Sequence, residues 1–219
     1  TGCNDWLDVS PKADMKAEDL FGTEAGFRDA LVGVYALMCG TNSYGRDLTY
    51  GYLDVLAQYY NSPLKTTSSG YEHNFKNAAE YKYTEKTEES RISSIWSNHF
   101  SAVANINQAM LFIDENKGVF TSPEVHDVYK GEFLALRAFL HFDILRLFAP
   151  SAAMNNNKGL DALAIPYVDV FTNIAQSQLT VKEVLKKIET AAEILKEAYD
   201  PEDVDVVKDI YIQSLNGST

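Results

Sequence analysis

Apolar residues recur three and four positions apart in four long segments of this chain: residues 23–38, 90–116, 124–148 and 180–199. That spacing places the apolar side chains of each segment on one face of a helix. One short piece, residues 164–168, reads instead as extended chain. The pattern predicts an almost entirely α-helical domain.

The segment 124–148 is apolar around most of its circumference. Between residues 133 and 148 only four polar side chains interrupt the apolar run: Arg137, His141, Asp143 and Arg146. It is too short and too charged to cross a bilayer, which takes about 20 apolar residues. Ser122 and Pro123 are typical of a helix start, and Pro150 ends the helix. We expect a central helix that neighbours bury on several sides.

The first and last helices carry more specific signals. Gly33 lies inside the first helix at a cost of about 1 kcal/mol relative to alanine, which suggests close packing. Cys39 follows in an apolar pattern and is expected to be buried, although a disulfide with Cys3 is an alternative. Thr180 and Glu183 form a capping box at the start of the last helix. No helical partner follows that helix in the sequence, so we expect self-association through residues 180–199.

Residues 41–87 differ from the rest in carrying turn signals and eight of the thirteen tyrosines. Disordered segments are poor in aromatic residues, so a connection of this length is expected to be functional. Aromatic rings stack on the apolar face of a sugar, while Asp and Asn side chains bind its hydroxyls. The alternative is that these tyrosines only pack the loop onto the helices. The glycan-binding candidates are Asp54, Tyr59, Tyr60, Asn61, Tyr71 and Asn74.

Charge and motif content narrow the function further. The formal net charge is −12, which disfavours nucleic acid and anionic lipid surfaces as partners. The four histidines are scattered, and no metal-binding, phosphate-binding or nucleophile motif appears, so we expect no cofactor and no metal. Arg137 and His141 stand one helical turn apart. One interpretation is a catalytic pair. The one that we favour is that Arg137 forms a core ion pair with a carboxylate, either Glu132 or an acid from a neighbouring helix. Asn107 is expected to satisfy a backbone group.

Several stretches together carry a resemblance to a known family. They are residues 131–149 (GEFLALRAFLHFDILRLFA), 21–38 (FGTEAGFRDALVGVYALM), the Asp5–Pro11 pattern D-x-L-x-x-x-P, the set Trp96, Phe100, Val103 and Asn107, and residues 164–168 (AIPYV). In this order they resemble the SusD/RagB family of outer-membrane nutrient-binding lipoproteins. The resemblance implies helical hairpins of tetratricopeptide-like type. Family members are more than twice as long, so the chain is expected to be a fragment or a shortened member without the C-terminal half.

The resemblance also implies a domain organisation and a function. Residues 1–20 would be a lipoprotein N-terminus and tether, 21–200 the helical domain, and 201–219 an acidic tail. Thr1-Gly2-Cys3 matches the end of a bacterial lipoprotein signal peptide, with lipid on Cys3 as the only membrane anchor. We expect a cell-surface glycan-binding lipoprotein of the outer membrane that delivers oligosaccharides to a SusC-like, TonB-dependent transporter without catalysis. The alternatives are a helical interaction module without a ligand site and an unrecognised glycoside hydrolase.

Overall fold

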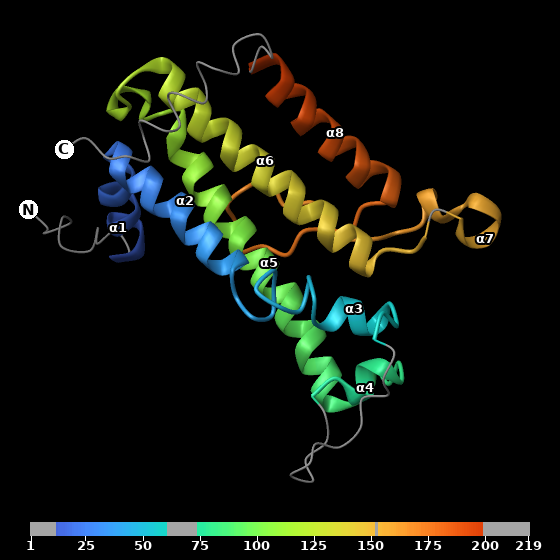
Figure 1. Ribbon diagram of the computed structural model, residues 1–219. Coiled ribbons are helices and arrows are strands. Elements are labelled where there is room, and N and C mark those ends of the chain that lie inside the picture. Colours follow the sequence, from blue (N-terminus) through green and yellow to red (C-terminus); the bar gives the residue numbers. More distant parts are fainter. Residues whose placement is uncertain (1–11, 61–73, 152, 199–219) are drawn as a thin grey trace, which may run out of the picture. The chain divides into compact units, whose positions relative to one another are not determined.

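The computed structural model describes residues 12–60, 74–151 and 153–198, and most of these residues are helical (Figure 1). The elements in chain order are α1 (Lys12–Phe21), α2 (Glu24–Met38), α3 (Tyr52–Leu56), α4 (Lys76–Ala79), α5 (Lys86–Ile113), η1 (Lys117–Val119), α6 (Pro123–Phe148), α7 (Met154–Asn157), η2 (Gly159–Asp161) and α8 (Val181–Ala198). The described residues contain no strand, only an isolated antiparallel bridge between Leu163 and Thr180. The all-α prediction is confirmed, and the four predicted long helices agree with α2, α5, α6 and α8 to within a few residues.

The described chain forms two compact units. One unit comprises the described parts of residues 1–32 and 105–219, and the other comprises those of residues 33–104. Helices α2 and α5 contribute residues to both units. The first unit contains the central helix, and the second contains the tyrosine-rich segment.

In the first unit α6 is the buried helix that the sequence predicted. The Ser122 hydroxyl accepts a hydrogen bond from the Val125 N–H at 3.4 Å, and Pro123 occupies the first turn. The helix therefore begins at the predicted residues. Twelve of its residues are buried, and they point in many directions around the axis: His126, Tyr129, Gly131, Phe133, Leu134, Leu136, Ala138, Leu140, His141, Asp143, Ile144 and Leu145. Phe139 and Phe142 are exposed exceptions.

Helix α8 packs beside α6 and begins with the predicted capping box (Figure 1). The Thr180 N–H donates to the Glu183 carboxylate at 2.8 Å, and the Glu183 N–H donates to the Thr180 hydroxyl at 3.2 Å. Val181, Val184 and Ala191 of the apolar stripe are buried, whereas Leu185 and Ile188 are half-buried. Self-association through this helix stays a prediction.

A group of aromatic rings forms another part of the first unit's core. Phe21 lies 5.0 Å from Phe27 and 5.2 Å from Phe112, measured between ring centroids, and Phe27 lies 4.9 Å from Phe120. Phe21 is the last residue of α1, so part of the stretch that the sequence suggested as a tether is helical and ends in the core. Residues 1–11, including Cys3, lie outside the described residues.

The second unit packs the beginning of α5 against the end of α2 and the turns that follow it. The Asn98 amide donates to the Leu37 carbonyl at 2.9 Å, and the Asn42 amide donates to the Ser94 carbonyl at 3.4 Å. Two expectations about this region are wrong. Cys39 is exposed because it follows the last turn of α2. Close packing does not explain Gly33, because a Cβ there would meet no atom within 4 Å.

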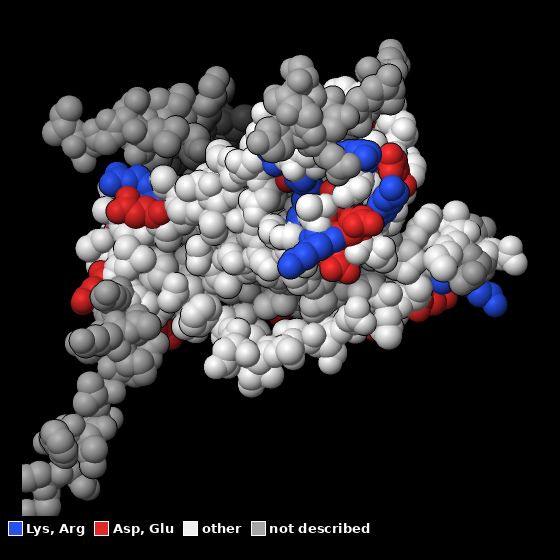
Figure 2. Space-filling view, turned by 90° about the horizontal axis from the view of Figure 1, so that it is seen from below, with Lys and Arg blue, Asp and Glu red and all other residues white. Residues whose placement is uncertain are grey.

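The surface charge is mixed rather than separated by sign on the face that Figure 2 shows. Lys and Arg side chains lie next to Asp and Glu side chains, and most of that face carries neither. The net charge of −12 therefore does not gather there into one acidic patch.

Candidate functional site

Of the seven described tyrosines in residues 41–87, one is buried, Tyr44 is half-buried, and five are exposed. Tyr52, in α3, is 4% exposed and belongs to the core of the second unit. Five others have 46–74% of their surface exposed, and we call them the tyrosine group: Tyr50, Tyr59, Tyr60, Tyr81 and Tyr83. Packing therefore accounts for Tyr52, whereas the rings of the tyrosine group are accessible to a ligand.

Hydrogen bonds tie the tyrosine group to the short helices α3 and α4. The Tyr60 hydroxyl donates to the Tyr50 carbonyl, just before α3, and the Tyr81 hydroxyl donates to the Leu56 carbonyl at 2.9 Å. The rings of Tyr81 and Tyr83 lie 6.2 Å apart. The Gln58 amide links the two helices by donating to the Ala79 carbonyl at 3.2 Å. The side chains of Tyr60 and Tyr81 are therefore held on a folded support.

Two residues of this support have left-handed backbone. Gln58 and Tyr81 have φ of 58° and 55°, and each lies just past the end of its helix, α3 and α4 respectively. A left-handed residue is a common helix terminator, but glycine usually takes the position because a side chain is disfavoured there. Their side chains make the two hydrogen bonds just described, to Ala79 and to Leu56, which helps to offset that cost.

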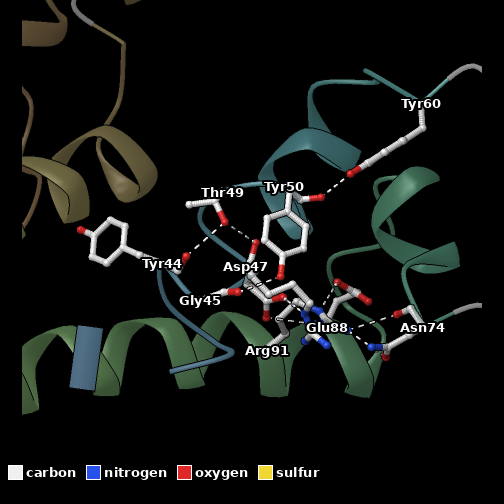
Figure 3. A network of polar contacts seen from close by, with 10 residues as sticks. Tyr44, Gly45, Asp47, Thr49, Tyr50, Tyr60, Asn74, Glu88 and Arg91 are labelled. Atoms are coloured by element: carbon white, nitrogen blue, oxygen red, sulfur yellow. Dashed lines mark hydrogen bonds and ion pairs between the residues drawn. The ribbon is translucent and has the colours of Figure 1, made fainter. Parts of the chain in front are cut away.

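A network of buried charges lies beneath Tyr50 and the start of α3 (Figure 3). Arg91, in α5, donates to the Asp47 carboxylate at 3.2 Å and to the carbonyl and amide oxygens of Asn74 at 3.1 Å each. Asp47 and Glu88 are 1% and 0% exposed. The Glu88 carboxylate lies 3.6 Å from the Arg91 Nε, which is an ion-pair distance but too long for a hydrogen bond.

Burial and charge pairing both shift the pKa values of this network. Burial raises the pKa of Glu88, and the nearby Arg91 offsets only part of that effect. Burial, together with the charge of Glu88, raises the pKa of Tyr52 to about 12. The pKa of Arg46 is also raised, chiefly because its side chain donates to Asp47 at 2.8 Å. Tyr52 therefore stays protonated and Arg46 stays charged near neutral pH, which suits a structural support.

A shallow polar groove of about 390 Å³ lies at this network. Its lining consists of hydroxyl, amide and charged side chains: Thr41, Asn42, Arg46, Asp47, Asn74, Thr87, Ser90, Arg91 and Ser94. A neighbouring hollow of about 400 Å³ shares Asn42, Ser90 and Ser94 and follows α5 as far as Ser101. The second unit thus offers exposed aromatic rings together with a groove of hydrogen-bonding groups.

The structure describes four of the six predicted glycan-binding residues. Tyr59 and Tyr60 are 74% and 48% exposed. Asp54 is half-buried in α3, and its carbonyl accepts from the Tyr59 N–H at 3.0 Å. Asn74 is exposed, but Arg91 binds both of its oxygens. The other two, Asn61 and Tyr71, lie outside the described residues.

Sequence reasoning missed the charged residues of the support. Arg91 and Glu88 stand three residues apart on α5, a spacing that could have suggested an ion pair. Nothing in the sequence could have joined Arg91 to Asp47, because 44 residues separate them. Tyr81 and Tyr83 were counted among the tyrosines but were not singled out as candidates.

The first unit holds a second polar cluster, around Arg137 and His141. Arg137 donates to the Asn107 side-chain oxygen at 2.9 Å and to the Asp169 carbonyl at 3.1 Å, where the sequence suggested a carboxylate partner. The Asn107 amide donates to the carbonyls of Val168 and Val170 at 3.0 and 3.2 Å, which confirms its predicted backbone-satisfying role. The cluster fastens the extended segment after α7 to α5 and α6, so its geometry is that of a structural joint.

The described residues contain no group of three or more His, Cys, Asp or Glu side chains placed to hold a metal ion. None of the helices described is both long and apolar enough to cross a membrane.

Comparison with known proteins gives a family and a fold. The SusD-like family model, described as "Starch-binding associating with outer membrane", matches residues 5–205. A SusD superfamily protein from Bacteroides thetaiotaomicron is similar in structure, with a TM-score of 0.60 and 18% identity over 80% of this chain and 37% of that one. Another from Bacteroides vulgatus has a TM-score of 0.60 and 19% identity over 87% of this chain and 43% of that one. The chain thus spans about two fifths of these structures. The search of curated proteins gave no match.

Proposed function

Since this chain belongs to the SusD-like family, we propose that it binds oligosaccharides through the tyrosine group and performs no chemistry on them. The observation that carries the proposal is the exposure of five tyrosine rings on the folded support of α3 and α4. Exposed rings can stack on the C–H faces of sugars, and the hydroxyl and amide groups of the adjoining groove can bind sugar hydroxyls.

The charges in the groove favour a neutral oligosaccharide over a charged one. Arg46 and Arg91 both pair with the Asp47 carboxylate, at 2.8 and 3.2 Å. Binding an acidic sugar would require these pairs to open or to share their donors, which costs free energy. Neutral hydroxyls can use the remaining lone pairs and the serine and asparagine groups of the groove without breaking an ion pair.

The cellular setting of the proposal rests on the family. We propose an outer-membrane, cell-surface location, with lipid on Cys3 as the anchor, and a SusC-like, TonB-dependent transporter as the partner. Two or more acyl chains suffice for stable anchoring, because each buried CH2 contributes about 0.8 kcal/mol. Labelling with radioactive palmitate, compared between the native gene and a Cys3→Ala variant, tests the anchor.

Calorimetry against a panel of neutral and acidic oligosaccharides tests ligand binding. Tyr59→Ala, Tyr60→Ala and Tyr71→Ala should each weaken binding about twofold to tenfold, since an aromatic contact contributes about 0.5–1.5 kcal/mol beyond its buried area. Phe171→Ala is the matched control, because Phe171 is a 49% exposed aromatic residue of the first unit. Helicity by circular dichroism should be the same in all variants.

The same experiment separates the alternatives. Wild-type affinity in all three tyrosine variants would place the sugar site away from Tyr59, Tyr60 and Tyr71. Absence of binding to every oligosaccharide would favour a protein-interaction module without a ligand site. Release of shortened sugars from an oligosaccharide incubated with purified protein would indicate a hydrolase and would overturn the assignment of a purely binding role.

A further inference from the structure

A single buried guanidinium holds both ends of the segment that carries most of the tyrosine group. The Arg91 side chain is 9% exposed. One terminal nitrogen donates to Asp47, which lies before α3, and the other donates to two oxygens of Asn74, which lies before α4. Tyr50, α3, Tyr59 and Tyr60 all lie between those two attachment points in the sequence. Arg91 therefore closes the loop that bears these rings (Figure 3).

Aromatic contacts fix the orientation of that guanidinium. Its carbon lies 4.5 Å from the ring centroid of Phe75 and 5.6 Å from that of Tyr52. Arg46 lies 5.3 Å from the same Phe75 ring. Stacking of this kind uses the flat face of a guanidinium, while its edge stays available for hydrogen bonds. A lysine ammonium could supply the charge but could not replace both sets of contacts.

From Asp47, hydrogen bonds lead on to the exposed rings. The Asp47 carbonyl accepts from the Leu53 N–H at 3.0 Å, which sets the start of α3. In the same turn, the Tyr50 hydroxyl donates to the Gly45 carbonyl at 3.0 Å, and the Tyr60 hydroxyl donates to the Tyr50 carbonyl. The positions of the Tyr50 and Tyr60 side chains thus depend on the turn of residues 45–51, which Asp47 anchors to Arg91.

The turn has little freedom to adopt another shape. A Cβ on Gly45 would lie 2.3 Å from the Cys39 carbonyl oxygen, and one on Gly51 would lie 2.8 Å from the Arg46 carbonyl oxygen. Such short approaches exist only because both residues lack a side chain. A turn packed this closely transmits a displacement of Asp47 to the residues that follow it.

We infer that Arg91 is a positioning residue for the proposed oligosaccharide site: it orients Tyr50 and Tyr60 through Asp47, and it links Asp47 to Asn74. The inference rests on the proposed function for its ligand, but the placement of the rings is a property of the protein alone. It predicts that a guanidinium is required at position 91, and that a positive charge by itself is insufficient.

A double-mutant cycle tests the inference on binding. In the otherwise wild-type chain, Tyr60→Ala should weaken binding of the best oligosaccharide about twofold to tenfold. Arg91→Lys should weaken it by a similar factor. In the Arg91→Lys background, Tyr60→Ala should then add almost nothing, because the ring is no longer held in place. Arg146→Lys is the matched control, since Arg146 pairs with Asp143 on α6 in the first unit, and it should leave the full effect of Tyr60→Ala.

Hydrogen exchange of the ligand-free protein gives an independent readout. In Arg91→Lys, the amides of Gly51 and Leu53 should exchange at least several-fold faster, because their acceptors lie in the turn that Asp47 anchors. The amides of α6 should keep their wild-type rates. The inference would be overturned if the affinity loss of the double variant equalled the product of the losses in the two single variants. Unchanged exchange at Gly51 and Leu53 would also overturn it. If the wild-type chain binds no oligosaccharide, the proposed function fails, and the exchange experiment still decides whether Arg91 positions the loop.

Discussion

The buried imidazole of His141 should make the stability of this protein fall sharply in mild acid. The side chain is fully buried on α6, and its ring stacks on Tyr167 with 4.1 Å between centroids. Its Nδ1 lies 2.8 Å from the Arg137 carbonyl oxygen, and its Nε2 lies 2.9 Å from the Val168 N–H. A carbonyl can only accept and an N–H can only donate, so Nδ1 carries the proton and Nε2 is the acceptor. This arrangement requires the neutral ring.

Burial is the main reason that the pKa of His141 falls from 6.5 to about 4, and the positive charge of Arg137 adds to the effect. The Arg137 carbonyl opposes it by accepting the Nδ1 proton. In the unfolded chain His141 takes up a proton below about pH 6.5, whereas in the folded protein it stays neutral down to about pH 4. Stability from this group is therefore fully present above pH 6.5 and is lost as the pH falls towards 4.

The loss in the free energy of unfolding follows from the shift in the pKa of His141. A difference of about 2.5 pKa units corresponds to roughly 3 kcal/mol, of which about 2 kcal/mol should already be lost at pH 5. That is a large part of the free energy of unfolding of a typical domain. His141→Gln provides the comparison, because a glutamine oxygen can accept from the Val168 N–H but does not titrate.

Urea unfolding of both proteins from pH 4 to pH 7.5 measures the effect. The variant is expected to be less stable than the wild type at pH 7.5, and the difference should shrink or reverse as the pH falls, changing by roughly 3 kcal/mol in all. Subtracting the two curves cancels the titration of all other groups. A difference that stays constant with pH, or an NMR titration of His141 with a midpoint near 6.5, would refute the reasoning.

Two further predictions concern α8. Thr180→Ala removes one half of the capping box and should lower the free energy of unfolding by about 1 kcal/mol, measured by urea denaturation, whereas Thr180→Ser should change it little; equal losses in the two variants would contradict the capping role. The sequence also predicts self-association through residues 180–199. Light scattering should then give a mass above that of one chain, which Ile188→Lys lowers because Ile188 is half-buried on the stripe; a monomeric wild type would contradict it.

Local signals in the sequence determined the four long helices of this protein. Apolar spacing placed α2, α5, α6 and α8 to within a few residues, and the side chains of Ser122, Thr180 and Glu183 cap the helices that they were expected to cap. These interactions join residues three or four positions apart, so both partners can be recognised within a short stretch of sequence. The same window explains why α3 and α4 were missed, since helices of five and four residues show too little periodicity to detect.

Only the tertiary structure decided which polar residues act together and which tyrosines are exposed. Arg91 meets Asp47 across 44 residues, and His141 meets the Val168 N–H across 27. Tyr52 and Tyr59 look alike in sequence, yet one is in the core and the other is 74% exposed. Cys39, too, was expected to be buried and is exposed. Burial and charge pairing depend on what the rest of the folded chain brings to a residue, and no local pattern encodes that.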